Sequence, residues 1–74
     1  MDNRLKTWAL NIKFARMKKG ISQEELAFRI NSARNFIGCI ERAEKAPTVI
    51  TLARIANALN ITLSRLVENV DSTN

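Results

Sequence analysis

Helical periodicity is the feature of this sequence that most restricts its fold. Apolar residues recur three and four positions apart along most of the 74 residues, whereas valine, isoleucine and threonine never alternate long enough to make a convincing strand. A chain of this length forms one domain and lies near the lower limit for a self-sufficient core. We therefore predict a single, compact all-α domain over residues 1–74, with five short helices and a core drawn from residues 4–70.

Start and stop signals give the bounds of the first two helices. The first is predicted from Arg4 to Lys19. Gly20 is its stop signal and follows two lysines, which suit a helix C-terminus. The second begins at Ser22, which opens a capping box with a glutamate three residues later. Asn31 ends it, because asparagine tolerates the left-handed conformation.

The remaining helices are placed by the same signals. The third is predicted over residues 33–43. Thr48 and Thr62 cap the fourth and the fifth, and Asn60 ends the fourth. The side chains expected to face the core are Leu5, Trp8, Ile12, Ala15, Leu26, Ala27, Ile30, Phe36, Ile37, Ile40, Val49, Leu52, Ile55, Ala56, Leu59, Leu63 and Leu66.

The spacing of small and apolar residues over 22–42 predicts a helix-turn-helix made by the second and third helices. Counted from Gln23 as position one, apolar residues stand at positions 4, 8, 15 and 18. The small Ala27 at position 5 allows the helices to cross closely, and Asn31 takes the left-handed turn at position 9. An antiparallel hairpin can have an equally short loop. This spacing favours instead the perpendicular arrangement, whose second helix enters the major groove of DNA.

Composition argues against catalysis and metal binding. The chain has no histidine and one cysteine, Cys39, so histidine catalysis, the usual zinc sites and an internal disulfide are excluded. It shows no glycine-rich phosphate loop, and we predict neither an enzyme nor a cofactor. No apolar run approaches the roughly 20 residues of a membrane span. The absence of a signal peptide and a disulfide favours the cytoplasm. The net charge of +5 favours a polyanionic partner.

Three strings carry a resemblance to a known family. SQEELA at 22–27, FIGCIER at 36–42 and TLARIANALNI at 51–61, with Pro47 before the last, resemble the lambda-repressor/Cro-type (XRE-like) family over about residues 8–67. Within it, the short chain resembles the controller proteins of restriction–modification systems. The resemblance implies a transcriptional regulator that binds double-stranded DNA as a homodimer on a near-palindromic operator. RNA polymerase is a further candidate partner, and no small-molecule ligand or membrane contact is expected.

The candidate DNA contacts cluster around the third helix. Arg34 and Asn35 stand at its predicted start, and these residue types read guanine and adenine in the major groove. The residues expected to contact bases are Ala33, Arg34, Asn35, Gly38 and Cys39, and those expected to contact phosphates are Ser22, Gln23, Arg42 and Lys45. For the cations among them, a solvated surface position is the alternative.

The resemblance also implies two contacts between helices. It gives Gln23 the role of bridging a phosphate and the third helix, and it pairs Arg16 with Glu41 in a structural ion pair. The sequence departs from the family at Ser32 and Ala33, where the usual apolar and capping residues have exchanged places. Because serine is the better N-cap, the third helix could start one residue early, capped by Ser32.

Apolar residues left over from the core predict contact surfaces. We expect a dimer interface around Ile50, Val67 and Val70 on the fourth and fifth helices. The rival surface on the first helix is the stripe of Leu10, Phe14 and Met17, with Phe28 beside it. These residues also keep open a second function, that of an antitoxin or other protein-interaction module on a helix-turn-helix fold.

Overall fold

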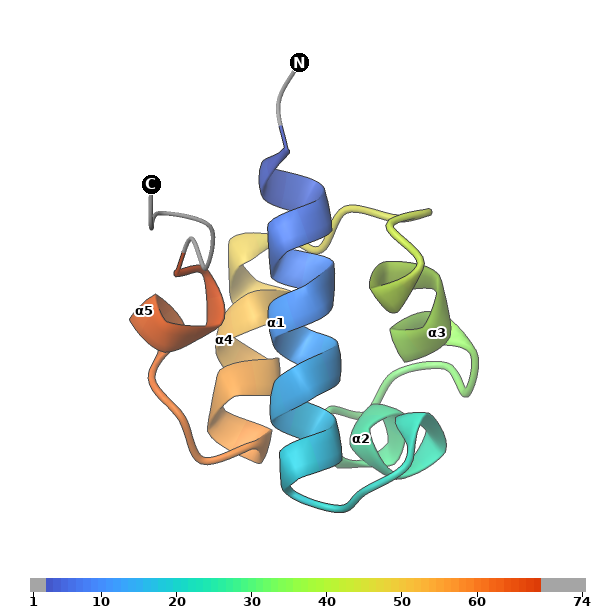
Figure 1. Cartoon of the computed structure of the whole chain (residues 1–74). Coiled ribbons are helices and arrows are strands. Elements are labelled where there is room, and N and C mark those ends of the chain that lie inside the picture. The colour runs from blue at the N-terminus through green and yellow to red at the C-terminus, as the bar shows by residue number, and fades with distance from the viewer. Residues whose placement is uncertain (1–2, 69–74) are drawn as a thin grey trace.

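The predicted all-α fold is confirmed by a computed structural model, which describes residues 3–68 and holds five helices and no strand over that range. The helices are α1 (Arg4–Lys18), α2 (Gln23–Arg29), α3 (Phe36–Glu41), α4 (Val49–Ala58) and α5 (Leu63–Leu66). In Figure 1, α1 crosses the centre of the view, with α2 and α3 to one side and α4 and α5 to the other. α1 contacts α3 and α5, and α2 contacts both α3 and α4.

The core forms where the stripes of all five helices meet. Its buried apolar side chains are Ala9, Ile12, Leu26, Ala27, Ile30, Ile37, Ile40, Leu52, Ile55, Ala56, Leu59 and Leu66. Two expected core positions are wrong, because Val49 is 70% exposed and Leu63 is 36% exposed. Each is the first residue of its helix. The apolar period therefore continues one turn beyond the part of the helix that packs on the core.

The predicted capping residues act as expected. The hydroxyl oxygens of Ser22, Thr48 and Thr62 accept hydrogen bonds from the backbone N–H three residues later, at 3.0, 3.1 and 3.2 Å. Asn31 and Asn60 both have φ near +59°, as their stop signals predicted. The capping box is only half formed, because the Glu25 carboxylate accepts a bond from Arg29 Nε at 2.9 Å.

The third helix is shorter than predicted. It begins at Phe36, three residues later than expected, and it is not capped by Ser32. The Ser32 hydroxyl donates instead to the Ala27 carbonyl at 3.3 Å, and its N–H donates to the same oxygen at 2.9 Å. Ser32 therefore closes the end of α2. At the other end, Ala43 lies at φ +59° and stops α3 after Glu41, although alanine is disfavoured in this conformation.

A buried polar residue, Asn11, joins the middle of α1 to the C-terminal end of α5. Its Nδ2 donates to the carbonyl oxygens of Leu66 at 2.8 Å and Glu68 at 2.7 Å, just where α5 ends. Asn11 is 9% exposed. Two hydrogen bonds from its Nδ2 offset the cost of burying this amide.

Replacing Asn11 by alanine tests this connection. Asn11→Ala leaves two carbonyl groups without their donor, so we expect a loss of about 1–3 kcal/mol in the free energy of unfolding. Thermal denaturation followed by circular dichroism measures it. Asn57→Ala, on the exposed surface of α4, is the matched control. Equal melting temperatures for the two variants would show that the Asn11 bonds contribute nothing.

Candidate nucleic-acid interface

The helix-turn-helix is built by α2, the connection 30–35 and α3, which pack on each other beside α1 (Figure 1). Leu26 and Ala27 on α2 and Ile37 and Ile40 on α3 are at most 1% exposed and share one apolar cluster. The small Ala27 is buried, as its position in the pattern predicted. Packing therefore fixes α3 on its inner side and leaves its outer side available.

A buried carboxylate fixes the polar end of this motif. Glu41 Oε2 accepts from Arg16 Nε at 2.7 Å, and Oε1 accepts from Arg16 Nη2 at 3.1 Å and from Gln23 Nε2 at 2.9 Å. Arg16 Nη1 donates to the carbonyl of Ile21 at 2.8 Å. The Arg16 and Glu41 side chains are 12% and 3% exposed. The predicted ion pair is confirmed, as is the link from Gln23 to α3.

Gly38 lies beneath two of the predicted phosphate-contacting side chains. A Cβ atom at this position would stand 3.1 Å from Arg42 Nη1 and 3.2 Å from Gln23 Oε1. The missing side chain therefore makes room for Arg42 and Gln23 to lie across α3. Gly38 is itself buried, and its contact with a base stays a prediction. Its role in making room for these two side chains was not visible in the sequence.

The start of the third-helix segment is open to solvent. Ala33, Arg34 and Asn35 are exposed, and Cys39, one turn further on, is half-buried. Arg34 Nε lies 3.7 Å from Glu24 Oε2, with side chains 84% and 69% exposed. These residues thus occur together on the accessible side of the motif, although residues 33–35 precede the regular helix.

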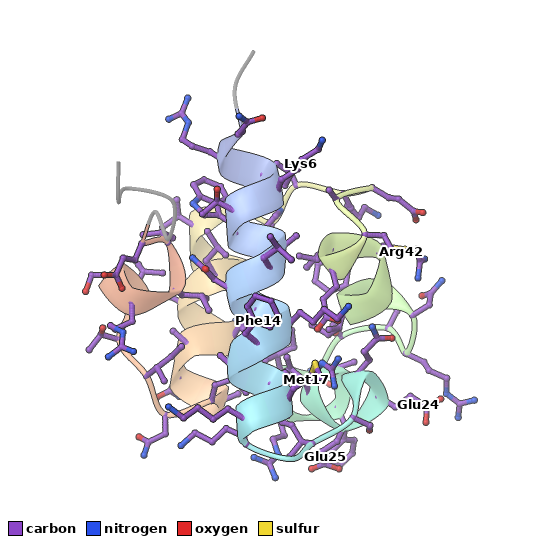
Figure 2. All side chains as sticks on the ribbon, viewed as in Figure 1. Lys6, Phe14, Met17, Glu24, Glu25 and Arg42 are labelled. Atoms are coloured by element: carbon purple, nitrogen blue, oxygen red, sulfur yellow. The ribbon has the colours of Figure 1, made fainter. Side chains whose placement is uncertain are left out.

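Arg42 is held by a neighbouring acid. Its Nε and Nη2 donate to Glu44 Oε2 and Oε1 at 2.9 and 3.2 Å. These hydrogen bonds lower the pKa of Glu44, and the same bonds raise the pKa of Arg42. The remaining predicted phosphate contacts, Ser22 and Lys45, are exposed. Figure 2 shows Arg42 and Glu24 on the flank of the molecule formed by α2 and α3.

The surfaces predicted for dimerisation differ from one another in burial. Ile50 is 68% exposed, whereas Val67 is half-buried and packs against the core. Val70 lies outside the described residues. On the rival surface, Leu10, Phe14, Met17 and Phe28 are 44%, 58%, 56% and 79% exposed. Phe14 and Met17 lie along α1, toward the viewer in Figure 2.

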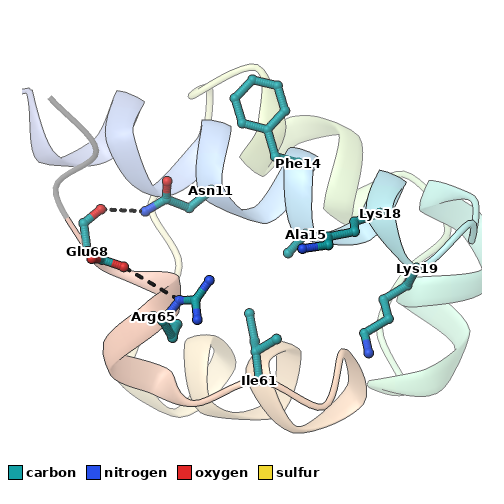
Figure 3. Close-up of a pocket in the computed structure, with 8 residues that line it drawn as sticks. All are labelled: Asn11, Phe14, Ala15, Lys18, Lys19, Ile61, Arg65 and Glu68. Carbon is teal, nitrogen blue, oxygen red and sulfur yellow. Dashed lines mark hydrogen bonds and ion pairs between the residues drawn. The ribbon is translucent and has the colours of Figure 1, made fainter.

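A hollow of about 520 Å³ lies between α1 and α5 (Figure 3), and none of its lining residues comes from the segment 33–45. Its lining residues are Asn11, Phe14, Ala15, Lys18, Lys19, Ile61, Arg65 and Glu68. No group of three or more metal-ligating acidic, cysteine or histidine side chains occurs within residues 3–68. Over the same range, no helix is long and apolar enough to cross a membrane.

Replacing Glu41 by glutamine tests the buried network. Glu41→Gln leaves Arg16 buried without its counter-charge, so we expect a loss of about 3–5 kcal/mol in the free energy of unfolding. Urea titration followed by circular dichroism measures this loss. The matched control is Glu25→Gln, whose exposed pair with Arg29 should contribute less than about 1 kcal/mol. A midpoint for Glu41→Gln no lower than that of the control would contradict the prediction.

Comparison with known proteins agrees with the geometry of α2 and α3. A sequence model of the helix-turn-helix family matches residues 12–66. The HTH-type transcriptional regulator y4dJ of Sinorhizobium fredii is 39% identical over 62 residues, which cover 81% of this chain and 80% of that protein. The control protein C.SmaI of Serratia marcescens is 37% identical over 59 residues, covering 80% of this chain and 70% of that protein.

A solved structure extends the similarity to the whole fold. The restriction–modification controller protein C.AhdI of Aeromonas hydrophila superposes with a TM-score of 0.82 at 29% identity, covering 89% of this chain and 99% of that one. The matching segment contains the α2–α3 motif, the Glu41 network and the core. The chain therefore belongs to the helix-turn-helix family, among its XRE-like transcriptional regulators and not among enzymes.

Proposed function

We propose that the chain is a sequence-specific regulator that binds a near-palindromic DNA operator as a homodimer. The observation that carries this proposal is the exposure of Arg34 and Asn35 immediately before α3, a helix whose opposite side packs in the core. Arginine forms a bidentate pair with guanine, and asparagine with adenine. Ala33 and Cys39 would supply smaller contacts beside them.

Phosphate contacts would orient this helix in the groove. Arg42 and Lys45 follow α3, and Ser22 and Gln23 stand at the beginning of α2. Contacts to phosphates position a protein on the duplex and carry no sequence information. The proposed division of roles is therefore base readout by residues 33–35 and Cys39, and positioning by the residues that contact phosphates at both ends of the motif.

The regulated genes are proposed to be those of a restriction–modification system. This proposal is supported by the similarity to the controller proteins C.SmaI and C.AhdI, which the chain matches over most of their length. A methyltransferase gene and an endonuclease gene next to the coding sequence would support it. Other neighbouring genes would leave a DNA-binding regulator of a different system.

The dimer is proposed to form through α4 and α5. Of the two predicted interface residues within 3–68, Ile50 is the more exposed, and Val67 adds a half-buried edge. α4 and α5 lie on the other side of α1 from α3 in Figure 1. A two-fold contact there would leave both recognition helices free to enter major grooves about 34–36 Å apart.

Arg34→Ala tests base readout. After selection of a preferred site from random duplexes, we expect this variant to lose about 1–3 kcal/mol of binding free energy on that site and to relax preference at one base pair. Binding to random DNA should fall much less. Lys45→Ala is the control, since a phosphate contact should affect both kinds of DNA alike. Fluorescence anisotropy measures both, and equal losses for Arg34→Ala would assign Arg34 to phosphate.

Ile50→Asp tests the dimer interface. Because a charge is strongly disfavoured on burial, this variant should sediment as a monomer and bind the selected site weakly. The melting temperature of the Ile50→Asp monomer should be close to that of the unaltered protein measured under conditions in which it is monomeric, since Ile50 is exposed within the protomer. Val67 is less suitable because it also packs on the core. A dimeric Ile50→Asp beside a monomeric Phe14→Asp would move the interface to α1.

A further inference from the structure

Every acidic side chain within residues 3–68 lies in an ion pair with an arginine. Glu41 is buried with Arg16, and its role is structural. Two other pairs involve arginines of the proposed DNA surface, namely Glu44 with Arg42 and Glu24 with Arg34. Carboxylates on a surface that must approach phosphates require an explanation, because like charges repel.

The Arg42–Glu44 pair has the geometry of an occupied phosphate site. Two nitrogens of the guanidinium donate to two oxygens of one carboxylate, at 2.9 and 3.2 Å. Arginine uses the same bidentate fork for phosphate. The same bonds lower the pKa of Glu44 below that of a free glutamate, which is itself ionised at neutral pH. The third nitrogen, Nη1, faces the bare backbone of Gly38, so the guanidinium lies against α3.

We propose that Glu44 is an intramolecular competitor of the DNA backbone and thereby lowers the affinity of the protein for DNA of any sequence. The inference rests on the proposed function, which places Arg42 at a phosphate. A phosphate that takes the Arg42 fork must displace Glu44 and then lie near its negative charge. Because a phosphate contact carries no sequence information, this opposition acts on all DNA alike. Binding to a DNA site then depends more strongly on the contacts with its bases and on the contacts that a second protomer adds.

The Arg34–Glu24 pair opposes DNA more weakly. Its single contact is 3.7 Å long, and both side chains are mostly exposed. Exposed pairs without good geometry contribute little. Glu44 is therefore the residue on which the test is made.

Two charge-matched variants separate competition from a general change in net charge. Glu44→Gln and Glu68→Gln each remove one negative charge from an exposed pair with arginine. The Arg65–Glu68 pair, 3.6 Å long, lies on the α5 side of the hollow (Figure 3), whose lining includes no residue of the segment 33–45. Glu44→Gln should bind a short random-sequence duplex about three- to fivefold more tightly per protomer. A plot of the logarithm of its DNA-binding constant against the logarithm of the salt concentration should have a slope that is more negative by about one per protomer.

Glu68→Gln should show a clearly smaller gain in affinity than Glu44→Gln. Equal gains for the two variants would overturn the inference while leaving DNA binding itself intact. Failure of the unaltered protein to bind the duplex at low salt would overturn the proposed function and the inference with it. Circular dichroism melts confirm that both variants remain folded at the temperature of the binding assay.

A double-mutant cycle identifies Arg42 as the contested group. In an Arg42→Gln background, the further change Glu44→Gln should give only the smaller gain seen for Glu68→Gln, because no guanidinium is left to release. If the full gain persists without Arg42, Glu44 acts through the overall field of the protein and does not compete for Arg42. That result would overturn the inference.

Discussion

The position of α3, the second helix of the motif, depends on one carboxylate. α3 has only six residues, and isolated helices of that length are not stable in water. Its inner side is held by apolar contacts, which resist separation but have little directional preference. Glu41 adds direction, because its two oxygens accept three bonds from α1 and from the first residue of α2. A nearly buried charge with this many partners leaves few other orientations for the helix.

The same constraint reaches the surface through Gln23. Its Nε2 is bound to Glu41, so its Oε1 is fixed over α3 at the position of Gly38. The absence of a Cβ at Gly38 lets both Gln23 and Arg42 lie across the helix. Arg42 then reaches Glu44 in the turn that follows. The buried ion pair, the glycine and the exposed ion pair are therefore successive steps of one arrangement.

Local signals in the sequence predicted most of the fold. Ser22, Thr48 and Thr62 reveal their helices because capping is a contact between neighbours in the chain, and the core of α2 and α3 follows from spacing. Asn11 could not be found in this way, since its acceptors are 55 and 57 residues away. The start of α3 was predicted wrongly because Ser32 could either cap α3 or close α2. In the structure its hydroxyl and its N–H both donate to the Ala27 carbonyl. In the candidate site, residue types and the Arg16–Glu41 pair were predictable, whereas the partners of Arg42 and Arg34 were not.

Lysines and arginines differ in their partners within residues 3–68, which suggests different roles in the approach to DNA and in close contact with it. Arginine takes all five ion pairs with glutamate among residues 3–68, and no lysine in that range takes one. Lysines are compact, strongly hydrated charges, whereas the arginine fork is planar and directional. With a net charge of +5, the lysines would supply a long-range field that draws the protein to a polyanion. Of the paired arginines, Arg42, and more weakly Arg34, would be held by a glutamate until a phosphate or a base replaces that carboxylate, so their contact with DNA would be an exchange of partners.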